Sequence, residues 1–298
     1  LKGWGEAPFH AQQIFSWIYK KAILDFNQMS DLPSELRKRL KGNFSIFNLT
    51  LAKISESKDG TKKFLFELKD KNFIEAVMIP TEKRITGCIS TQVGCRFACR
   101  FCASGLLGFK RNLTCGEMIE EALFLKKITH LVFMGTGEPL DNYDNVIKAI
   151  RIINSAYGLN IGARRITIST CGIIPAIKKL QNEGLQIELS ISLHAADDKT
   201  RAQLLPINKK YPLKDLIQAC KEYINRTKRQ ITFEYVLIKG VNSDLQNARK
   251  LSTILKDLRL CKVNLIPANT VKELNIEPPK NSEILKFCYF EQCLFIPG

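Results

Sequence analysis

Three cysteines lie close together in one short stretch of the sequence. Cys95, Cys99 and Cys102 fall in the run Gly-Cys-Arg-Phe-Ala-Cys-Arg-Phe-Cys, and three thiolates this close can bind one metal centre. A structural zinc site normally has four ligands, whereas a cubic iron-sulfur cluster held by three cysteines leaves one iron open to a further ligand. The number of cysteines therefore favours a cluster. A zinc site stays the alternative, with Cys88 or Cys115 as its fourth ligand.

Polar residues that could bind a ligand follow several apolar, strand-like segments. The run 135–139, Gly-Thr-Gly-Glu-Pro, offers bare backbone for close approach and a carboxylate that can accept a hydrogen bond from an amino group. The runs 169–172 and 192–194 and the residue Asn269 occupy similar positions after other segments. Each alone could be a turn or a strand-end cap. Together, after the three cysteines, they favour a binding site.

The elements that must position these residues alternate between strand and helix. The predicted strands are 85–90, 130–134, 165–169, 186–193, 231–238 and 262–266, with mostly helical segments between them. Thr114 and Glu117, three residues apart, predict a capping box at the start of a helix. This alternation predicts an α/β protein with a parallel sheet or open barrel, whose functional residues lie at the carboxyl ends of the strands.

The chain before residue 84 has a different pattern. Residues 9–24 place apolar side chains, from Phe9 to Ala22, on or near one face and predict an amphipathic helix. A second helix is predicted after Pro33, with Leu36 and Leu40 on its apolar side. From about residue 51, short β-rich runs broken at 58–60 and 69–72 predict a β-meander. We therefore expect a helical module over 1–48, a β-meander over 49–83 and the α/β domain over 84–298.

The composition indicates a globular protein with a strong positive charge. Lys and Arg number 45 against 29 Asp and Glu, a net charge of +16, which favours a nucleic-acid partner, although a compositional bias of the genome would produce the same excess. No apolar run or leader indicates a membrane or export, so we expect a cytoplasmic protein. The ten cysteines then indicate reduced thiols and metal binding. The first residue is Leu1, from which we expect an incomplete N-terminus.

Several motifs resemble those of a known enzyme family. The Cys-x3-Cys-x2-Cys spacing resembles the signature of radical S-adenosylmethionine (SAM) enzymes, and the run from Cys88 to Leu113 resembles the RlmN/Cfr family of radical SAM RNA methyltransferases. The resemblance extends over nearly the whole chain and includes the runs 13–17, 133–139, 165–172, 190–195, 234–236 and 264–267. Val93 favours the RlmN branch, which methylates carbon 2 of adenosine in 23S rRNA and tRNA; the alternative is a Cfr-like enzyme acting at carbon 8.

The resemblance implies a fold, cofactors and site residues. The fold would be a partial (β/α)6 radical SAM barrel with a small N-terminal helical module and the β-meander. Cys95, Cys99 and Cys102 would hold a [4Fe-4S] cluster. Contacts with SAM would come from Gly137, Glu138, Ser169, Ser192, Leu193, His194 and Asn269. Glu75 matches the family's proton acceptor and Cys88 its resolving cysteine, although a lone Glu is often a solvated residue and a lone Cys a buried one.

The methyl carrier is the point at which the sequence departs from the family. The family's carrier cysteine lies in a C-terminal segment resembling Arg-Gly-x-Asp-Ile-x-Ala-Ala-Cys-Gly-Gln-Leu, which this sequence does not contain. Cys288 and Cys293 lack that flanking motif, so we expect an incomplete C-terminal segment.

The expected partners are 23S rRNA, tRNA and an electron donor such as flavodoxin or ferredoxin, with the protein as a monomer. Two rival hypotheses are a radical SAM enzyme that forms a radical on a protein partner, and an RNA-binding relic without methyl transfer.

Overall fold

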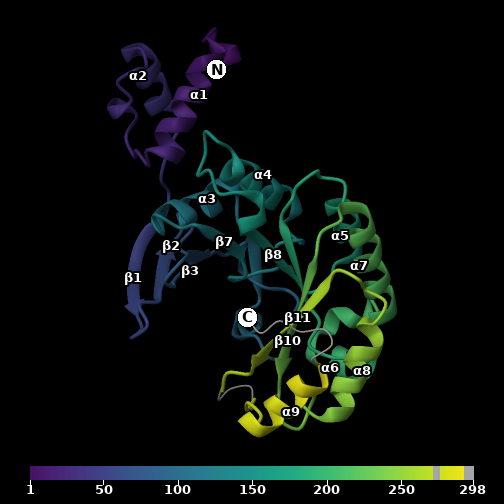
Figure 1. The fold of residues 1–298 in the computed structure, drawn as a ribbon. Helices are drawn as coiled ribbons and strands as arrows, with labels where there is room; N and C mark the ends of the chain where they lie inside the picture. The colour runs from purple at the N-terminus through teal and green to yellow at the C-terminus, as the bar shows by residue number, and fades with distance from the viewer. Residues whose placement is uncertain (271–275, 292–298) are drawn as a thin grey trace. The chain divides into compact units, whose positions relative to one another are not determined.

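The computed structural model describes residues 1–270 and 276–291, which form two compact units. The first unit comprises residues 1–91, 113–135 and 144–166, and the second comprises 92–112, 136–143 and 167–298. Both units consist of strands interleaved with helices (Figure 1). In the described part of the chain, every helix is too short or too polar to span a bilayer.

The first unit begins with a small helical module. Helix α1 (Pro8–Phe15) continues into a π-helical turn (Ser16–Lys20), and α2 (Ser34–Asn43) follows Pro33 as predicted. Leu36 and Leu40 are buried in a cluster with Phe26, Met29 and Leu32, against which Ile14, Trp17 and Ile18 pack. The predicted helix over 9–24 is therefore confirmed as far as Lys20. It is wrong for Ala22, whose left-handed φ of 51° breaks helical geometry. Phe9 is helical as predicted, but its side chain is 56% exposed and does not belong to the packed apolar face.

The β-meander of the first unit is also confirmed. Strands β1 (Thr50–Glu56), β2 (Lys62–Glu67) and β3 (Phe73–Pro80) pair antiparallel in that order, and β3 pairs antiparallel with β4 (Ile85–Cys88). Strand β4 then pairs parallel with β7 (His130–Phe133). Helix α3 (Cys115–Phe124) covers one face of these strands, with the Phe124 and Phe66 rings 4.9 Å apart, and it begins with the predicted capping box of Thr114 and Glu117.

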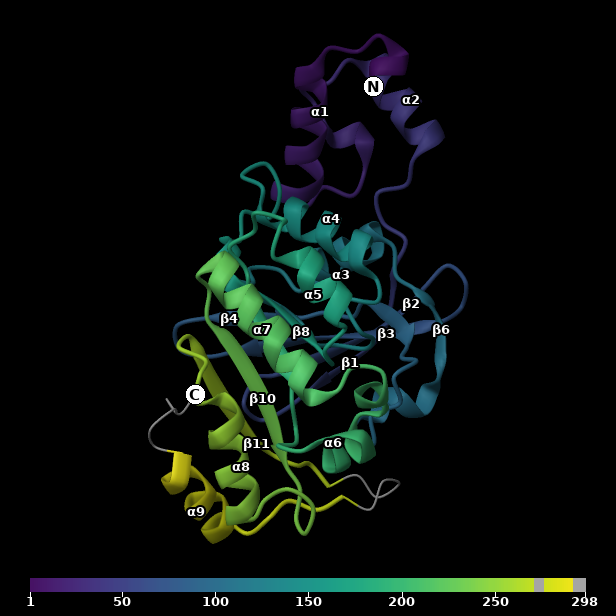
Figure 2. The ribbon, with the colours of Figure 1, turned by 90° about the vertical axis from the view of Figure 1, so that its right-hand side faces the viewer.

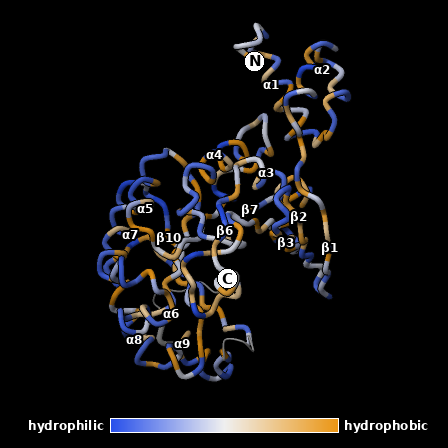
Figure 3. Tube along the Cα trace, turned by 180° about the vertical axis from the view of Figure 1, so that it is seen from behind, coloured by the Kyte–Doolittle hydropathy of each residue, from blue (hydrophilic) through white to orange (hydrophobic). Residues whose placement is uncertain are grey.

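The second unit contains four parallel strands in chain order: β8 (Ile166–Thr170), β9 (Glu188–Ser192), β10 (Ile231–Leu237) and β11 (Cys261–Pro267). Alternate residues of β10 are apolar and fully buried, whereas Thr232 and Glu234 lie on the opposite, polar face. Helices α5 (Ile174–Leu180) and α7 (Leu213–Thr227) lie side by side (Figure 2), and hydrophobic and hydrophilic residues mix along α7 (Figure 3) as expected for a helix with one buried face.

The remaining elements connect and flank these strands. They are β5 (Gln92–Gly94), β6 (Phe109–Asn112), α4 (Tyr143–Asn154), α6 (Asp198–Leu204), α8 (Leu245–Leu255), α9 (Asn281–Glu291) and five 3-10 turns: Lys2–Trp4, Phe26–Gln28, Ala103–Leu107, Ala163–Arg165 and Pro206–Lys209. All six strands predicted for the α/β region are present, and the helical segments lie between them as expected. The α/β class is therefore confirmed.

Candidate functional site

The three clustered cysteines lie on a loop of the second unit, between β5 and β6. These two strands form an antiparallel ribbon that closes the base of the loop, where the Cys95 N–H donates to the carbonyl of Gly108 at 2.9 Å. Gly94 has a φ of 73°, and a Cβ atom there would lie only 1.7 Å from the Gly108 oxygen. The ribbon therefore requires glycine immediately before the first cysteine.

Hydrogen bonds of the Gln92 side chain connect this loop to the segment that carries Glu138. Its Nε2 donates to Asn112 Oδ1 and to Asp141 Oδ2, each at 2.8 Å, and its Oε1 accepts from the Glu138 N–H at 2.9 Å. Gly137, with a φ of 102°, lies against the same side chain, because a Cβ atom there would be 2.5 Å from Gln92 Cβ. The missing side chain at Gly137, from which we predicted close approach to a ligand, thus makes room for the side chain of Gln92 in the same chain.

The cysteine thiols themselves are partly buried and close to one another. Burial, together with the charges of the neighbouring Cys102 and Cys95 thiolates, raises the pKa of Cys99 to about 12. Burial raises the pKa of Cys95 as well. Deprotonating several of these thiols is unfavourable without a cation, and a coordinated metal supplies that positive charge.

The donor set of the loop bears on which metal centre it could hold. Within residues 1–270 and 276–291, no three His, Cys, Asp or Glu side chains are close enough to hold one metal ion. The loop nevertheless carries three thiols whose charges act on one another, and three thiolates are the ligands of a cubic cluster with one open iron. The type and number of these donors therefore fit an iron-sulfur cluster.

Glu138 is buried, and backbone groups hold its carboxylate. Oε2 accepts from the Cys171 N–H at 2.8 Å, and Oε1 accepts from the Leu140 N–H at 3.0 Å. Burial raises the pKa of Glu138, whereas the Cys171 N–H, the Thr170 hydroxyl and the Leu140 N–H lower it. Glu138 therefore ties the end of β8 to the segment after β7, and its position is fixed before any ligand binds.

Three predicted SAM contacts lie at the carboxyl ends of β8 and β9. Ser169 pairs with Ser190 in the parallel register, and Ser192 pairs with Glu234 of β10, which places these side chains on the polar face of the strands. Leu193 is fully buried, and its N–H donates to the carbonyl of Glu234 at 3.0 Å. Burial raises the pKa of Glu234, which accepts a hydrogen bond from Asn264 Nδ2 at 2.8 Å.

His194 is a buried, neutral imidazole in a strained backbone conformation. Its φ is 56°, and Asn242 Nδ2 holds its carbonyl at 2.7 Å. Burial, together with the charge of Arg201, lowers the pKa of His194 to about 3. Because Nδ1 accepts the Val236 N–H at 3.0 Å, the ring proton resides on Nε2, which can act as a donor. The Phe101 ring, one residue before Cys102, meets the imidazole edge-on with centroids 4.4 Å apart.

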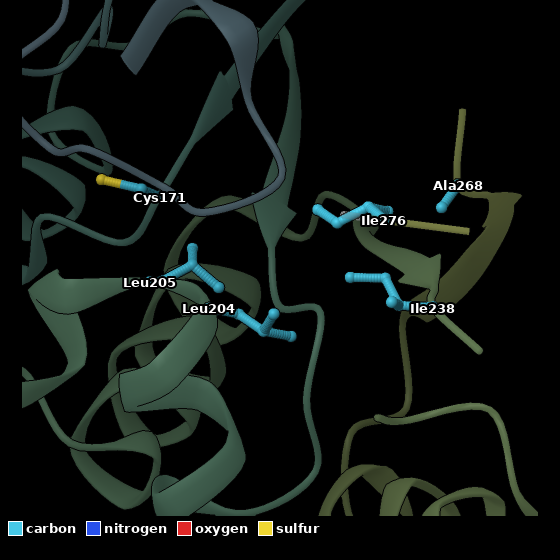
Figure 4. Close-up of a cluster of buried hydrophobic side chains, with 6 residues drawn as sticks. All are labelled: Cys171, Leu204, Leu205, Ile238, Ala268 and Ile276. Atoms are coloured by element: carbon cyan, nitrogen blue, oxygen red, sulfur yellow. The ribbon is translucent and has the colours of Figure 1, made fainter. Parts of the chain in front are cut away.

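An apolar cluster packs beside the cysteine loop in the second unit. It consists of Cys171, Leu204, Leu205, Ile238, Ala268 and Ile276 (Figure 4). Cys99 and Phe101 pack against it. Ala268 belongs to this cluster, whereas the next residue, Asn269, is exposed. The loop is therefore supported by apolar contacts as well as by the Gln92 hydrogen bonds.

Glu75 and Cys88 lie together in the first unit. Val77 of β3 pairs with Cys88 of β4, so Glu75, two residues from Val77, shares a sheet face with Cys88. Glu75 Oε1 forms an ion pair with Lys63 Nζ at 2.9 Å, and its side chain is 45% exposed. Burial raises the pKa of Cys88 to about 12, an effect that the Met134 N–H opposes. The thiol is therefore protonated at neutral pH.

The sequence did not identify several residues that hold this site. Gln92, Glu234 and Arg201 are buried polar groups with hydrogen-bond partners, but polar residues at such positions normally indicate a solvated surface. Gln92 and Glu234 had a signal, because they fall inside the run that begins at Cys88 and the run 234–236, whereas Arg201 had none. Cys288 lies on α9 and is partly buried. Cys293 lies outside the described residues.

Comparison with known proteins places two family models on this chain. The radical SAM superfamily matches residues 89–251, and the N-terminal domain of ribosomal RNA large subunit methyltransferases matches residues 1–46. A protein of Clostridium acetobutylicum named probable dual-specificity RNA methyltransferase RlmN is 51% identical, over 97% of this chain and 86% of that protein. A protein of Clostridium novyi with the same name is 48% identical, over 96% of this chain and 86% of that protein.

A solved structure has the same fold. The crystal structure of a radical SAM methyltransferase from Sphaerobacter thermophilus superposes with a TM-score of 0.94 at 40% sequence identity. The match covers 100% of this chain and 89% of that one. The expected radical SAM fold is confirmed by this likeness and by the superfamily match.

Proposed function

The chain belongs to the RlmN family of radical SAM RNA methyltransferases, and we propose that it methylates carbon 2 of adenosine in 23S rRNA and tRNA. Carbon 2 of adenine does not react with the electrophilic methyl group of SAM, so the reaction needs radical chemistry. The target adenine must also be unstacked to become accessible. A net charge of +16 favours binding to the phosphate backbone of such a substrate.

We assign the cofactor site to the second unit. Cys95, Cys99 and Cys102 would hold a [4Fe-4S] cluster, which supplies the electron that cleaves SAM when both are bound. Contacts with SAM would come from Gly137, Glu138, Ser169, Ser192, Leu193, His194 and Asn269. The neutral His194 can donate from Nε2.

We assign the proton-transfer and thiol steps to the first unit. Glu75 is the proposed acceptor of the ring proton, because its carboxylate is half-exposed and forms an ion pair with Lys63. Cys88 is the proposed resolving thiol, which releases the product by forming a disulfide with the methyl-carrying cysteine. Its raised pKa means that the thiol must lose its proton during the exchange.

The observation that carries this proposal is the cysteine loop. Three thiols lie close together on one β-ribbon loop, in a chain about half identical to RlmN proteins over nearly its whole length. A cytoplasmic monomer reduced by flavodoxin or ferredoxin is the setting that we propose. The three-part organisation over 1–48, 49–83 and 84–298 is proposed as the functional division of the chain.

The experiment is anaerobic reconstitution with iron and sulfide, followed by incubation with SAM, reductant and unmodified 23S rRNA. Mass spectrometry of the nucleosides and of deoxyadenosine gives the result. We expect deoxyadenosine. If 2-methyladenosine forms as well, Cys288 and Cys293 are tested next as carriers, and if deoxyadenosine forms alone, the cluster and SAM site work without a methyl carrier. Formation of 8-methyladenosine would instead support the Cfr-like alternative. Absence of deoxyadenosine from protein with a full cluster would contradict the catalytic assignment.

A further inference from the structure

Arg201 is a fully buried arginine in the second unit that belongs to no predicted motif. It lies on α6, a short helix whose N-cap residue Asp197 accepts from the Thr200 N–H at 2.9 Å. Its side chain is 0% exposed. Arginine is among the residues least often buried in this way, so the position requires a specific explanation.

The guanidinium group connects, by hydrogen bonds, the ends of two strands that carry proposed SAM contacts. Nη2 donates to the carbonyl of Cys171, just after β8, at 2.9 Å and to the carbonyl of Ser192, the last residue of β9, at 3.1 Å. Nε donates to the carbonyl of Leu193 at 3.1 Å, and Nη1 donates to Asn208 Oδ1 at 2.9 Å. The planar fork of arginine can serve all four acceptors at once, which a lysine ammonium cannot do in the same geometry.

The same short helix also supports the cysteine loop. The N–H of Arg100, the residue after Cys99, donates to the carbonyl of Leu204 at the end of α6, at 2.9 Å. Leu204 and Leu205 belong to the apolar cluster against which Cys99 packs (Figure 4). Helix α6 therefore touches the loop of the proposed cluster ligands and, through Arg201, the ends of β8 and β9.

Within the described residues, the positive charge of Arg201 has no carboxylate in direct contact, although the charge of Asp198 acts on it from nearby. All four of its acceptors are neutral, and within the described residues no carboxylate forms an ion pair with it. Asp198 is near, but its Oδ1 accepts from Asn208 Nδ2 at 2.8 Å and from the Leu213 N–H at 2.7 Å. A buried cation without a counter-charge is unfavourable, and burial accordingly lowers the pKa of Arg201.

The groups that can supply negative charge are thiols at the site. Arg201 Nη2 contacts the carbonyl of Cys171 at 2.9 Å, and Cys99 packs against the apolar cluster that contains Cys171. The charge of these two thiols, when they are ionised, opposes the effect of burial on the pKa of Arg201. Cys99 is ionised whenever it ligates a metal. Loading of the cysteine loop would therefore provide the anionic charge that the guanidinium lacks.

We propose that Arg201 is the positioning residue of the cofactor site: it fixes the ends of β8 and β9 for SAM and offsets the negative charge of the ligating thiolates. This inference rests on the proposed function for the identity of the cofactors. A nearby buried positive charge favours the reduced, more negative state of a bound cluster, so it raises the reduction potential. The fork of hydrogen bonds and the charge are separable, because lysine retains the charge without the fork.

The test compares Arg201→Lys and Arg201→Met with the unsubstituted protein after anaerobic reconstitution. Iron and sulfide content is measured first, then the potential by redox titration followed by electron paramagnetic resonance, and SAM affinity by equilibrium dialysis. We expect Arg201→Met to disfavour reduction about tenfold, the order of magnitude for one nearby buried charge at an effective dielectric constant of about 20. Tenfold corresponds to a potential ~59 mV more negative.

Arg201→Lys separates the two parts of the proposal. It should keep a potential near that of the unsubstituted protein but bind SAM about tenfold or more weakly, because the ends of β8 and β9 lose shared hydrogen bonds. Arg100→Met is the matched control: it removes an exposed arginine next to Cys99, whose charge water screens, and it should leave the potential nearly unchanged.

The outcomes are distinct. An unchanged potential in a fully loaded Arg201→Met protein, or equal shifts in Arg201→Met and Arg100→Met, would overturn the charge offset. Unchanged SAM affinity in Arg201→Lys would overturn the positioning role, and this second variant decides that point even where Arg201→Met does not fold. Both measurements omit RNA. An unsubstituted protein that binds the cluster and SAM but methylates no adenosine would therefore contradict the proposed function without touching the assignment of Arg201.

Discussion

The region proposed to bind the cofactors and the region proposed to transfer protons are built in opposite ways. In the second unit, the key polar groups are buried and held by several short hydrogen bonds, as for Gln92, Glu138 and His194. In the first unit, Glu75 is half-exposed on a meander strand, where its carboxylate has one ion pair, to an equally exposed Lys63. One region is fixed in advance and the other leaves its carboxylate accessible.

Charge differs between the regions as well. The second unit combines the buried cation of Arg201 with thiols that become anionic on binding metal. In the first unit, burial favours the uncharged forms of both Cys88 and the nearby Glu121, by raising the pKa of each. Binding requires preorganised donors and charges, whereas a group that exchanges protons must be able to change its charge. A residue proposed to react can therefore lie in an ordinary, half-exposed environment, whereas the residues proposed to bind the cofactors are buried and held by hydrogen bonds.

The largest effect that we predict is the loss of the cofactor from the preorganised region. Cys99→Ser should abolish iron-sulfur assembly and formation of deoxyadenosine, because a hydroxyl does not replace a thiolate as an iron ligand here. Iron analysis and mass spectrometry measure the two losses. Cys115→Ser is the control and should retain the iron. Loss of metal in both variants, with zinc bound by the unsubstituted protein, would support the zinc alternative instead.

The second prediction concerns the accessible carboxylate. Glu75→Gln should leave SAM cleavage intact and reduce methylation of RNA about 10²- to 10⁴-fold, the usual contribution of a general base. Deoxyadenosine and 2-methyladenosine are quantified in the same reaction. Glu56→Gln, which removes another exposed, ion-paired glutamate of the meander, should leave both products unchanged. If Glu75→Gln also stopped SAM cleavage, the separation of binding and reacting regions would fail.

A smaller effect is expected for the buried carboxylate of the binding region. In Glu138→Gln, an NH2 group replaces one oxygen and must face the N–H of either Cys171 or Leu140. A buried donor without an acceptor costs about 1–3 kcal/mol, so SAM affinity should fall roughly 10- to 100-fold. Equilibrium dialysis with the reconstituted protein measures it. Unchanged affinity would show that this region tolerates local rearrangement and is less fixed than its hydrogen bonds indicate.

Much of the fold could be predicted from the periodicity of apolar residues and from the cap and turn residues between the elements. The capping box at Thr114 and the three meander strands have local causes, namely a short polar cap and turn residues between alternating runs. The end of the first helix was not predictable in this way. Its sequence remains amphipathic through Ala22, but the chain turns at that residue to allow the packing of Trp17 and Ile18 against the α2 cluster.

The candidate site was predictable only where a motif carries it. Cys95, Cys99 and Cys102 have a spacing that identifies them, whereas the roles assigned to Glu75, Cys88 and the SAM contacts stay predictions based on resemblance. Arg201 and Glu121 could not be found from the sequence. Both are charged residues on helices, where a solvated position is the usual expectation. They are buried by tertiary contacts, with Ser90 for Glu121 and with Cys171 and Leu193 for Arg201.

The last prediction tests whether the first unit keeps its buried acid neutral. Glu121 is fully buried; its Oε2 accepts the Ser90 N–H at 3.0 Å, and among the described residues Oε1 has no hydrogen-bond partner. Burial raises its pKa well above the usual 4.5. At a pH between the pKa of Glu121 in the unfolded chain, 4.5, and its higher pKa in the folded chain, Glu121 is ionised when the chain is unfolded and protonated when it is folded. The contribution of Glu121 to the free energy of unfolding therefore falls as the pH rises above about 4.5.

Glu121→Gln should remove that loss of stability at high pH. In iron-free protein, urea unfolding should give similar free energies for the variant and the unsubstituted chain near pH 4, and a variant more stable by over about 1 kcal/mol at pH 8. Glu120→Gln is the contrast, because its carboxylate accepts from the Asn48 side chain and from two backbone N–H groups, and its loss should destabilise the fold at pH 8. An identical pH dependence in Glu121→Gln and the unsubstituted chain would mean that Glu121 is ionised. Cys88 would then lie near a negative charge, and the contrast between a charged binding region and a neutral reacting region would not hold.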